Sequence, residues 1–414
     1  MDLRMQNCRL HRGERVSHRK LLGIWMLGVV SLLSVAWGQR LQPADFQYLG
    51  AFAIDANQGG SWNTYGQRGM TFDSTGDPGN SDAFPGSLWI TGHDYERQVF
   101  EISIPTPSPS AQNWSQLPRP SLLTAPIQFT SGCIGELDYF AGVEVYESSI
   151  WGSCATGYNV TGEDLPAIMW RRKLSDLSNL QGPFHAGPIN DPEFHSNRQG
   201  MYLVSIPMDW ANTHLDGRTL ATGFSRNSHG GQLGPTLLAF DPDNPTNGYD
   251  LLWYRQDSRC FDNKALCDYP DYTACDNWSS AVWVRTATSD AVMFTGIKYD
   301  GGSDYVPGGW FCGPGFGEIT FYDPEDFVAR IEGRVQPWEV VPYATWRPEE
   351  LWYAENMYGG AAFDAVNGYF YVIETYAGPY GTAIIHVYQT EGGIGIFADG
   401  FETGNANNWS VKVP

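Results

Sequence analysis

The sequence has few positive charges for its length. Only five of its 414 residues are lysine, and 25 lysines and arginines stand against 46 aspartates and glutamates, which gives a formal charge of −21. Proteins that bind nucleic acid need a basic surface to contact the phosphate backbone. The composition therefore argues against nucleic acid as a partner, and it suits solubility, divalent cations or cationic ligands.

The common catalytic motifs are also missing. The chain contains no G-x-S-x-G, H-E-x-x-H or C-x-x-C sequence. Its glycine-rich segment Gly313–Gly317 lacks the strand-then-helix context of a phosphate-binding loop. These absences argue against a serine hydrolase of the nucleophile-elbow type and against a zinc enzyme. Whether the protein is an enzyme stays open at this stage.

Long apolar runs are absent except for one at the N-terminus. Leu21–Gly38 follows a basic segment and ends in Ala36-Trp37-Gly38, a small-x-small sequence. This pattern predicts a signal peptide over residues 1–38, cleaved before Gln39, and hence a secreted, periplasmic or cell-surface protein. An uncleaved anchor is the alternative, because 18 apolar residues could span a thin bilayer. Cleavage would leave 19 basic and 44 acidic residues, a charge of −25, and no membrane span.

The remaining cysteines are even in number. Six of the seven follow residue 38, which in an oxidising compartment predicts three disulfides. A zinc site is the alternative, but the spacings are too long for a zinc knuckle. The pairs expected from their positions are Cys133–Cys154, Cys267–Cys275 and Cys260–Cys312.

What the chain does contain is a repeated pair of strands. In Tyr358–Tyr376, an apolar run and an aromatic, β-branched run flank a turn at Asp364–Gly368. The same pattern recurs along the chain, and no helix of ordinary length is evident. The predicted first and second strands of each group are Gly69–Asp73 with Ser87–Gly92, Gly142–Tyr146 with Ile150–Cys154, Met201–Ile206 with Thr219–Gly223, Ala281–Arg285 with Ala291–Gly296, and Gly360–Asp364 with Tyr369–Thr375.

Third and fourth strands complete these groups. The predicted third strands are Gln98–Ile104, Ala167–Leu174, Thr236–Phe240, Glu318–Tyr322 and Ala383–Tyr388, and the predicted outer strands are Ile127–Ser131, Leu251–Arg255 and Trp338–Pro342. Groups of four strands are the unit of a β-propeller, so the sequence predicts an all-β propeller of about five blades. A β-sandwich is the alternative, since it also has short, regularly spaced strands.

The ends of the chain indicate how such a ring would close. Phe46–Ile54 has no earlier blade to join, and the last blade lacks an outer strand. Pairing the two would close the ring and hide both edges. The predicted domains are therefore a signal peptide at 1–38, a propeller at 39–392 and a C-terminal tail at 393–414.

The predicted ring has one loop-rich face. The connections that enter each first strand and those that join second to third strands emerge at the same end of a propeller. In this chain they are long, and all six cysteines that follow residue 38 lie in or beside them. Binding residues usually lie on such loops. The candidate binding residues on this face are Arg68, His93, Asp94, Glu136, His229, Asp276, Trp278, Asp300, Glu355 and Glu374.

These residue types suggest a binding protein first. Trp62, Trp278 and Trp310 in the predicted loops would suit stacking on sugar rings, whereas Trp89, Trp151 and Trp283 fall on strands and are expected in the core. The leading hypothesis is that a secreted monomer binds an extracellular ligand, such as carbohydrate or another polymer, on the acidic, disulfide-braced face. A protein-interaction scaffold is one alternative.

A hydrolase is the other alternative. Two or three carboxylates in a central funnel could act as general acid and base on a glycosidic bond, and the five-blade count resembles that of secreted glycosidase families. Calcium is the one cofactor considered, because Asp241-Pro-Asp243-Asn244 and Asp300–Asp304 offer oxygen ligands. Neither segment completes an EF-hand, and both contain ordinary turn residues.

Several segments resemble known sequences. Gly86–Asp94, Gly234–Pro242, Ile319–Phe327 and Gly359–Val372 resemble uncharacterised secreted bacterial proteins of propeller-like build. The resemblance spans most of the chain after the signal peptide and implies no known activity. Near the C-terminus, Ile396–Ser410 is similar to a short DGFE-type tail of bacterial secreted proteins, which implies a sorting or processing tag. A plain extra strand is the alternative for this segment.

Overall fold

The computed structural model divides the chain into two compact units, residues 1–37 and residues 38–414. The structure describes residues 40–56, 66, 68–78, 82, 84–93, 96–111, 113–133, 138–156, 164, 168–225, 234–255, 264–269, 272–273, 275–300, 304–306, 309–352 and 357–390. The predicted signal peptide and C-terminal tail lie outside these residues. Among the described residues, no helix has the length and apolar character needed to cross a membrane.

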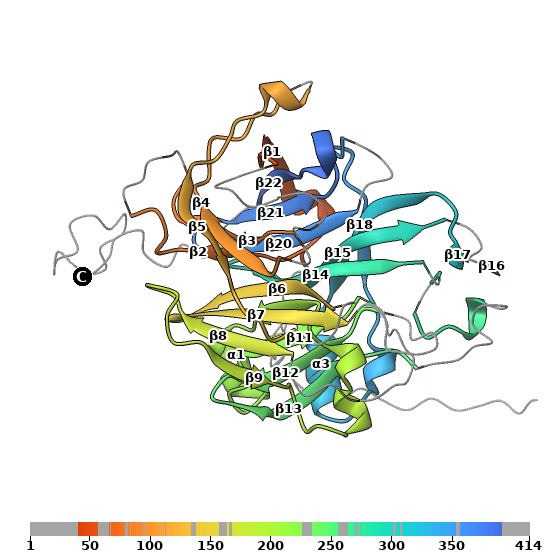
Figure 1. The fold of residues 1–414 in the computed structure, drawn as a ribbon. Coiled ribbons are helices and arrows are strands. Elements are labelled where there is room, and N and C mark those ends of the chain that lie inside the picture. Colours follow the sequence, from red (N-terminus) through yellow and green to blue (C-terminus); the bar gives the residue numbers. More distant parts are fainter. Residues whose placement is uncertain are drawn as a thin grey trace, which may run out of the picture. The chain divides into compact units, whose positions relative to one another are not determined.

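Five antiparallel sheets of four strands form the second unit (Figure 1). The first is β2 (Met70–Asp73), β3 (Ser87–Thr91), β4 (Gln98–Ile102) and β5 (Leu122–Gln128), and the second is β6 (Asp138–Tyr146), β7 (Ser149–Thr156), β8 (Met169–Lys173) and β9 (Gln181–Phe184). The third is β10 (Tyr202–Ser205), β11 (Leu220–Gly223), β12 (Leu237–Asp241) and β13 (Asn244–Leu252). The fourth is β14 (Asn277–Arg285), β15 (Asp290–Tyr299), β18 (Gly315–Tyr322) and β19 (Ala344–Trp346). The fifth is β20 (Tyr358–Asp364), β21 (Tyr369–Glu374), β22 (Ile384–Thr390) and β1 (Phe46–Ala53).

These sheets are the blades of a five-bladed β-propeller. The first strands β2, β6, β10, β14 and β20 each contact the next, and β20 contacts β2, so they surround a common axis. The fifth blade is completed by β1, which pairs with β22 in register Phe52 to Ile385. The propeller prediction and the predicted closure by the N-terminal strand are thus confirmed, and the sandwich alternative is wrong.

Glycines allow the first strands to approach each other closely near their starts. A Cβ atom on Gly69 would lie 2.3 Å from the carbonyl oxygen of Ala141, and one on Gly360 would lie 2.6 Å from the amide nitrogen of Met70. A larger residue at either position would push neighbouring blades apart, which explains why glycine is needed there.

Polar side chains join one first strand to the next. The Val145 amide donates to Thr71 Oγ1 at 3.1 Å, and the Ala361 amide donates to Ser280 Oγ at 3.2 Å. First strands have one edge that no other strand covers, so these side chains satisfy amides that the sheet leaves open.

Large side chains fill the space between blades. Trp151 of the second blade and Phe240 of the third are fully buried and pack with ring centres 5.7 Å apart. The predicted core tryptophans Trp89, Trp151 and Trp283 are all buried, as expected from their strand positions. Each fully buried large apolar side chain contributes about 1.5–3 kcal/mol to folding, so the packing between blades holds the ring together.

The outer strands depart most from the sequence prediction. β5 begins five residues before the predicted Ile127, and β13 ends at Leu252 instead of continuing to Arg255. The predicted strand Trp338–Pro342 is wrong: a 3₁₀ helix, η7 (Pro337–Glu339), starts there, and the outer strand is β19. Proline favours helix starts and sheet edges over central strands, which accounts for the displacement.

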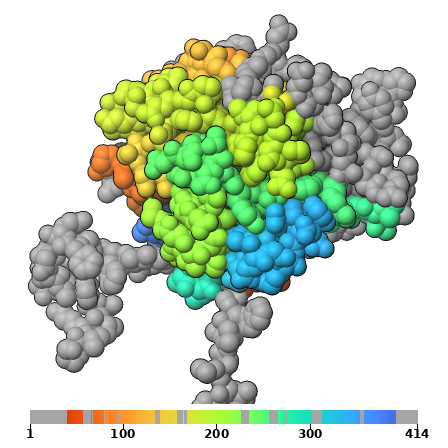
Figure 2. Space-filling model, turned by 90° about the horizontal axis from the view of Figure 1, so that it is seen from below, coloured from red at the N-terminus to blue at the C-terminus, as the bar shows by residue number. Residues whose placement is uncertain are grey.

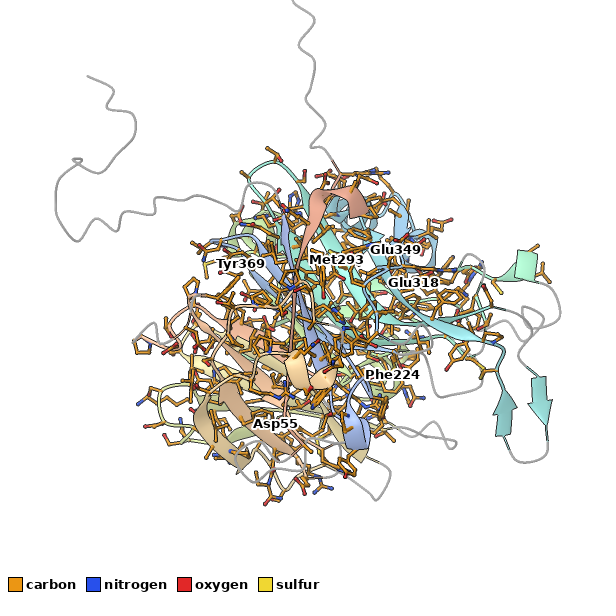
Figure 3. The ribbon with its side chains drawn as sticks, turned by 90° about the horizontal axis from the view of Figure 1, so that it is seen from above. Asp55, Phe224, Met293, Glu318, Glu349 and Tyr369 are labelled. Carbon is orange, nitrogen blue, oxygen red and sulfur yellow. A yellow bond between two sulfur atoms is a disulfide. The ribbon has the colours of Figure 1, made fainter. Side chains whose placement is uncertain are left out.

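Several elements were not anticipated. Two short α-helices occur in the described residues, α1 (Met208–His214) and α3 (Pro324–Ile331). Asp323 caps α3, because its side chain accepts a hydrogen bond from the Glu325 amide, and Pro324 occupies the first turn. A separate hairpin of β16 (Asp304–Val306) and β17 (Gly309–Phe311) lies between β15 and β18 and extends away from the sheets (Figure 3).

Two disulfides for which both cysteines are described brace one end of the ring. Cys133 and Cys154 are bonded, as predicted, with Cα atoms 5.7 Å apart. The other expected pairs are wrong, because Cys275 is bonded to Cys312. β14 and β18 both run antiparallel to β15, so residues just before each of them meet at the same end of the sheet. Cys267 is also disulfide-bonded, and Cys260 lies outside the described residues.

Candidate functional site

Six of the ten predicted binding residues lie in the described part of the chain. Arg68 has its guanidinium carbon 4.8 Å from the ring centre of Tyr139, and His93 forms an isolated bridge with Gly66. Asp300 is exposed, and its amide donates to the Pro314 carbonyl at 2.9 Å. The remaining predicted residues, Asp94, Glu136, His229 and Glu355, lie outside the described residues.

Asp276 is fully buried beside the Cys275–Cys312 disulfide. Its carboxylate accepts hydrogen bonds from Lys298 Nζ at 2.7 Å, the Thr273 hydroxyl at 2.7 Å and the Tyr299 amide at 3.0 Å. These donors satisfy the hydrogen-bonding needs of the buried carboxylate. Asp276 therefore fixes the segment before β14 to the end of β15.

Trp278 and Glu374 are also buried. Trp278 belongs to β14 and is fully covered, so the expectation that it lies in an exposed loop is wrong. Glu374 Oε2 lies 2.8 Å from Nε2 of His386, whose Nδ1 lies 3.2 Å from the Tyr48 hydroxyl. This chain of polar groups crosses β21, β22 and β1, and it therefore joins the closing strand to the last blade.

The first segment considered for calcium forms a tight turn. Asp241 to Asn244 joins β12 to β13, and the Asp243 amide donates to Asp241 Oδ1 at 2.9 Å. Of the second segment, residues 301–303 lie outside the described residues. Within the described ranges, no three histidine, cysteine, aspartate or glutamate residues are grouped so that they could hold a metal ion. A calcium site stays a prediction.

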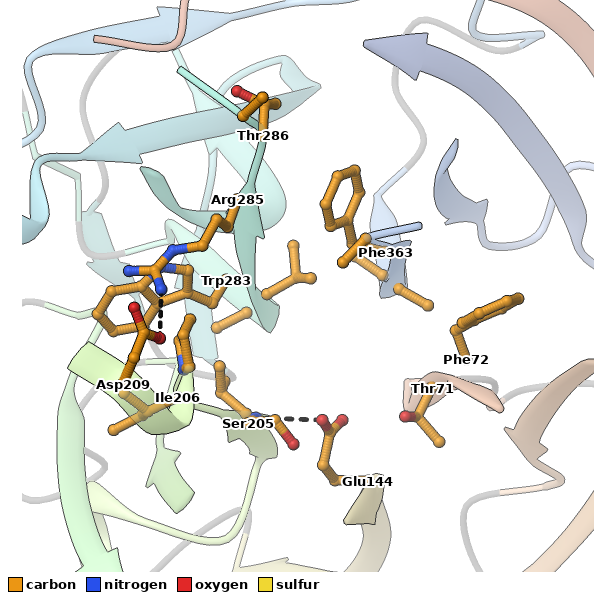
Figure 4. Close-up of a pocket in the computed structure, with 18 residues that line it drawn as sticks. Thr71, Phe72, Glu144, Ser205, Ile206, Asp209, Trp283, Arg285, Thr286 and Phe363 are labelled. Carbon is orange, nitrogen blue, oxygen red and sulfur yellow. Dashed lines mark hydrogen bonds and ion pairs between the residues drawn. The ribbon is translucent and has the colours of Figure 1, made fainter. Parts of the chain in front are cut away.

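A cavity of about 580 Å³ occupies the centre of the ring (Figure 4). We call it the funnel. Its wall is formed by the ends of the five first strands and by the residues that follow them. The disulfides instead lie where those strands begin, so the funnel opens at the end opposite to the predicted binding face. The lining residues used below are Phe72, Glu144, Ser205, Asp209, Trp283, Arg285 and Phe363.

The wall of the funnel is mainly apolar. Phe72 of β2 and Phe363 of β20 are half-buried, and in Figure 4 they lie across the cavity from Trp283 of β14. Small residues between them, including Ala281 and Ala362, leave the central space open. A cavity of this size and character matches small-molecule sites, which are mostly apolar and measure about 300–1,000 Å³.

Glu144 supplies a carboxyl group within this apolar wall. Its Oε1 accepts a hydrogen bond from the Ser205 amide at 3.1 Å, so it links β6 to β10. Burial raises the pKa of this carboxyl to about 7, although the hydrogen bonds from Ser205 and Thr71 oppose the rise. The side chain can therefore accept, donate or ionise near neutral pH.

An ion-pair cluster lies at the rim of the funnel. The Arg285 guanidinium contacts Asp290 at 2.6 Å and Asp209 of α1 at 2.6 Å. Asp209 is thus already paired, and the other acid in the described funnel wall is Glu144. Glycoside cleavage needs two carboxyl groups on either side of the bond. The described wall contains two acids, Glu144 and Asp209, and the second of these is held in an ion pair with Arg285.

Sequence reasoning did not select Glu144. It lies in Gly142–Tyr146, which was identified only as a first strand. The available signal was a single acid inside an otherwise apolar, aromatic strand, since an unpaired charge at a half-buried strand position is costly. That this position faces the axis follows from how the blades are arranged in the ring. The sequence pattern of the strand alone does not show it.

Comparisons with known proteins give little further information. No family model matches the chain, and no curated protein matches it. Among solved structures, a protein of unknown function from Dyadobacter fermentans DSM 18053 is 10% identical in sequence, with a TM-score of 0.40. The match covers 84% of this chain and 99% of that chain. A similarity at this level supports no statement about activity or ligand.

Proposed function

We propose that the protein is an extracellular binding protein whose funnel takes a small apolar ligand carrying an amine. The observation that supports this most directly is the Glu144 carboxyl group, which lines the same cavity as Phe72 and Phe363, whereas the other acid of the described wall, Asp209, is paired with Arg285. An apolar ligand body would pack on Phe72 and Phe363 while its ammonium group pairs with the carboxylate. The two described disulfides are compatible with an extracellular location.

The charge of the chain favours a cation over an anion. The formal charge of −21 attracts cations and repels anions at long range. Inside the funnel, an ammonium–carboxylate hydrogen bond contributes about 1.5–3 kcal/mol, which corresponds to roughly 10- to 100-fold in affinity. A neutral alcohol of the same shape would lack most of this gain.

The test compares phenylalkyl amines with phenylalkyl alcohols of matched length, using isothermal titration calorimetry on the mature protein. We expect the amines to bind more tightly, and we expect Glu144→Gln to weaken them at least tenfold while changing the alcohols less than threefold. Glu147→Gln, which alters an exposed acid three residues along, is the matched control. If neither class binds, or if Glu144→Gln leaves amine affinity unchanged, the proposal is wrong.

Dependence on pH provides a second readout. The pKa of the Glu144 carboxyl is about 7, so the ionised form that attracts an ammonium group predominates above that pH. Amine affinity should therefore rise between pH 6 and pH 8 in the wild type and stay flat in Glu144→Gln. The opposite slope would indicate that the protonated carboxyl binds the ligand, which contradicts an ammonium partner.

Binding of carbohydrate or another polymer at the disulfide-bearing face is a separate proposal. It is supported by the exposed Asp300 near the Cys275–Cys312 disulfide. Asp300→Ala should reduce retention on an immobilised polysaccharide panel without changing amine binding in the funnel. Equal retention of the variant and the wild type on every polysaccharide would contradict it.

A further inference from the structure

A second pocket, of about 350 Å³, lies at the outer rim between the third and fourth blades. We call it the rim pocket. It is lined by Arg198, Asp250 and Trp253 of the third blade and by Arg330, Gln336 and Trp338 of the segment that includes α3 and η7. β13 contacts both α3 and η7, and Figure 2 shows the green surface of the third blade beside the blue surface of this segment.

Two tryptophans form an aromatic wall in the rim pocket. Trp253 and Trp338 are half-buried, and their ring centres lie 5.0 Å apart at an angle of 62°. The Arg198 guanidinium lies 4.1 Å from the ring centre of Trp253, close enough for a cation–π contact. The Arg255 guanidinium likewise lies 5.0 Å from the ring centre of Trp338. Each half-buried indole is thus partly covered by an arginine, and the rest of its apolar area is offered to a ligand.

The floor of the pocket is polar and held in place. Asp250 is 3% exposed; its Oδ1 accepts from Arg330 Nη2 at 2.7 Å, and its Oδ2 accepts from Trp253 Nε1 at 2.8 Å. Arg198 is 7% exposed, and its Nη1 donates to the Glu193 carbonyl at 3.2 Å. These bonds fix the orientation of planar donor and acceptor groups, which is the preorganisation that a binding site needs.

One buried donor in the floor has no partner within the described residues. Nε of Arg330 makes no hydrogen bond there, although the same side chain contacts Asp250. Buried polar atoms almost always have a hydrogen-bond partner. A donor without one beside a cavity therefore indicates a position where a ligand could accept a hydrogen bond.

The charges of the pocket balance. Arg198 and Arg330 are matched by Asp250 and Glu193 in a chain with a formal charge of −21. A cationic ligand would meet two arginines and an anionic ligand two carboxylates. The groups that line the pocket therefore favour neither charge, which suits an uncharged polar molecule.

We propose that the rim pocket binds a neutral saccharide. The C–H face of a pyranose ring packs on indole, while its hydroxyls donate and accept at the same time and so match planar guanidinium, carboxylate and amide groups. The volume of about 350 Å³ lies in the range of small-ligand sites, which begins near 300 Å³. This inference does not depend on the ligand of the funnel.

The test uses neutral cello-, xylo-, manno- and chito-hexaose, with hexagalacturonate as the anionic comparison, titrated into the mature protein by calorimetry and tryptophan fluorescence. We expect at least one neutral hexaose to bind, with a loss of at least tenfold in Trp338→Ala and of at least threefold in Gln336→Ala. Gln336 is exposed, so that variant keeps the test valid if Trp338→Ala unfolds.

Two controls separate this site from the rest of the surface. Trp114→Ala removes another half-buried tryptophan that lies under an arginine, Arg119, at 4.6 Å, but outside the pocket. Glu144→Gln alters the funnel. Both should bind the hexaose like the wild type. The proposal would be overturned if none of the four neutral hexaoses binds, or if both pocket variants keep the wild-type affinity. It would also be overturned if hexagalacturonate binds more tightly than the neutral hexaoses and its binding weakens with salt.

Discussion

At the scale of single residues, Glu144 combines a structural and a chemical role. Its carboxylate satisfies the open Ser205 amide of the next blade, as Thr71 does for Val145. Threonine would be sufficient for that structural role, whereas glutamate adds an ionisable group beside the funnel. The pKa of this carboxyl is raised because its side chain is desolvated in the mainly apolar wall of the funnel.

Glu144 should also affect stability as a function of pH. Burial raises the pKa of its carboxyl from 4.5 to about 7 in the folded protein. Between these pH values the folded protein keeps a proton on Glu144 that the unfolded chain has lost, and this proton binding stabilises the folded state. The stabilisation is complete below pH 4.5 and disappears as the pH rises through 7. Relative to Glu144→Gln, the wild type should lose on the order of 3 kcal/mol of unfolding free energy between pH 4.5 and pH 8.

Urea unfolding at pH 5, 6, 7 and 8 measures this difference. Glu147→Gln should follow the wild-type curve, because that side chain is exposed. Parallel curves for wild type and Glu144→Gln would show that the carboxyl titrates alike in the folded and unfolded states, contrary to its position in the funnel.

At the scale of elements, the sequence predicts the first three strands of each blade well and the fourth poorly, except in the fifth blade, where β1 was predicted as the closing strand. First strands such as Ala281–Arg285 are apolar and bounded by turns, because both faces are covered by neighbouring blades. Outer strands face solvent and lack this apolar pattern. β9, for example, consists of Gln-Gly-Pro-Phe. Burial produces the pattern that sequence analysis detects, and strands at the rim have less of it.

The pairing of Cys275 failed for a related reason. Spacing along the chain favoured Cys267 as its partner, but strand direction decides which loop ends meet. Glu144 was missed because orientation toward the axis is a property of the assembled ring. The polymer-binding candidates Asp276 and Glu374 were selected for their charge, although both are buried in polar networks.

The close approach of the first strands requires a glycine at position 69, and this requirement can be tested. In Gly69→Ala the new Cβ would lie 2.3 Å from the Ala141 carbonyl oxygen, so β2 and β6 must separate. We expect the free energy of unfolding to fall by about 1–3 kcal/mol, the usual cost of overpacking. Gly333→Ala is the comparison, since its φ of 72° gives backbone strain but nothing lies within 4 Å of the added atom. Chemical denaturation of both variants tests this, and a smaller loss for Gly69→Ala would contradict the crowding.

At the scale of the whole molecule, disulfides restrain a ring that packing already closes. The Cys133–Cys154 bond spans 21 residues and the Cys275–Cys312 bond spans 37. Loop-closure entropy predicts that replacing either pair by serine costs about 3 kcal/mol, with the longer loop costing about 0.5 kcal/mol more. Thermal unfolding of the two double variants measures both values. A variant as stable as the wild type would mean that packing alone fixes that end of the ring.

The pairing of β1 with β22 joins a strand near the start of the propeller to one that ends at Thr390. During synthesis, β1 is made first but must wait for its partner until nearly the whole propeller has been translated. The ring therefore cannot close before β22 has been synthesised, and folding must bring together segments more than 300 residues apart. Such distant pairing is slow, so we expect the pairing of β1 with β22 to be a late step in the folding of the propeller.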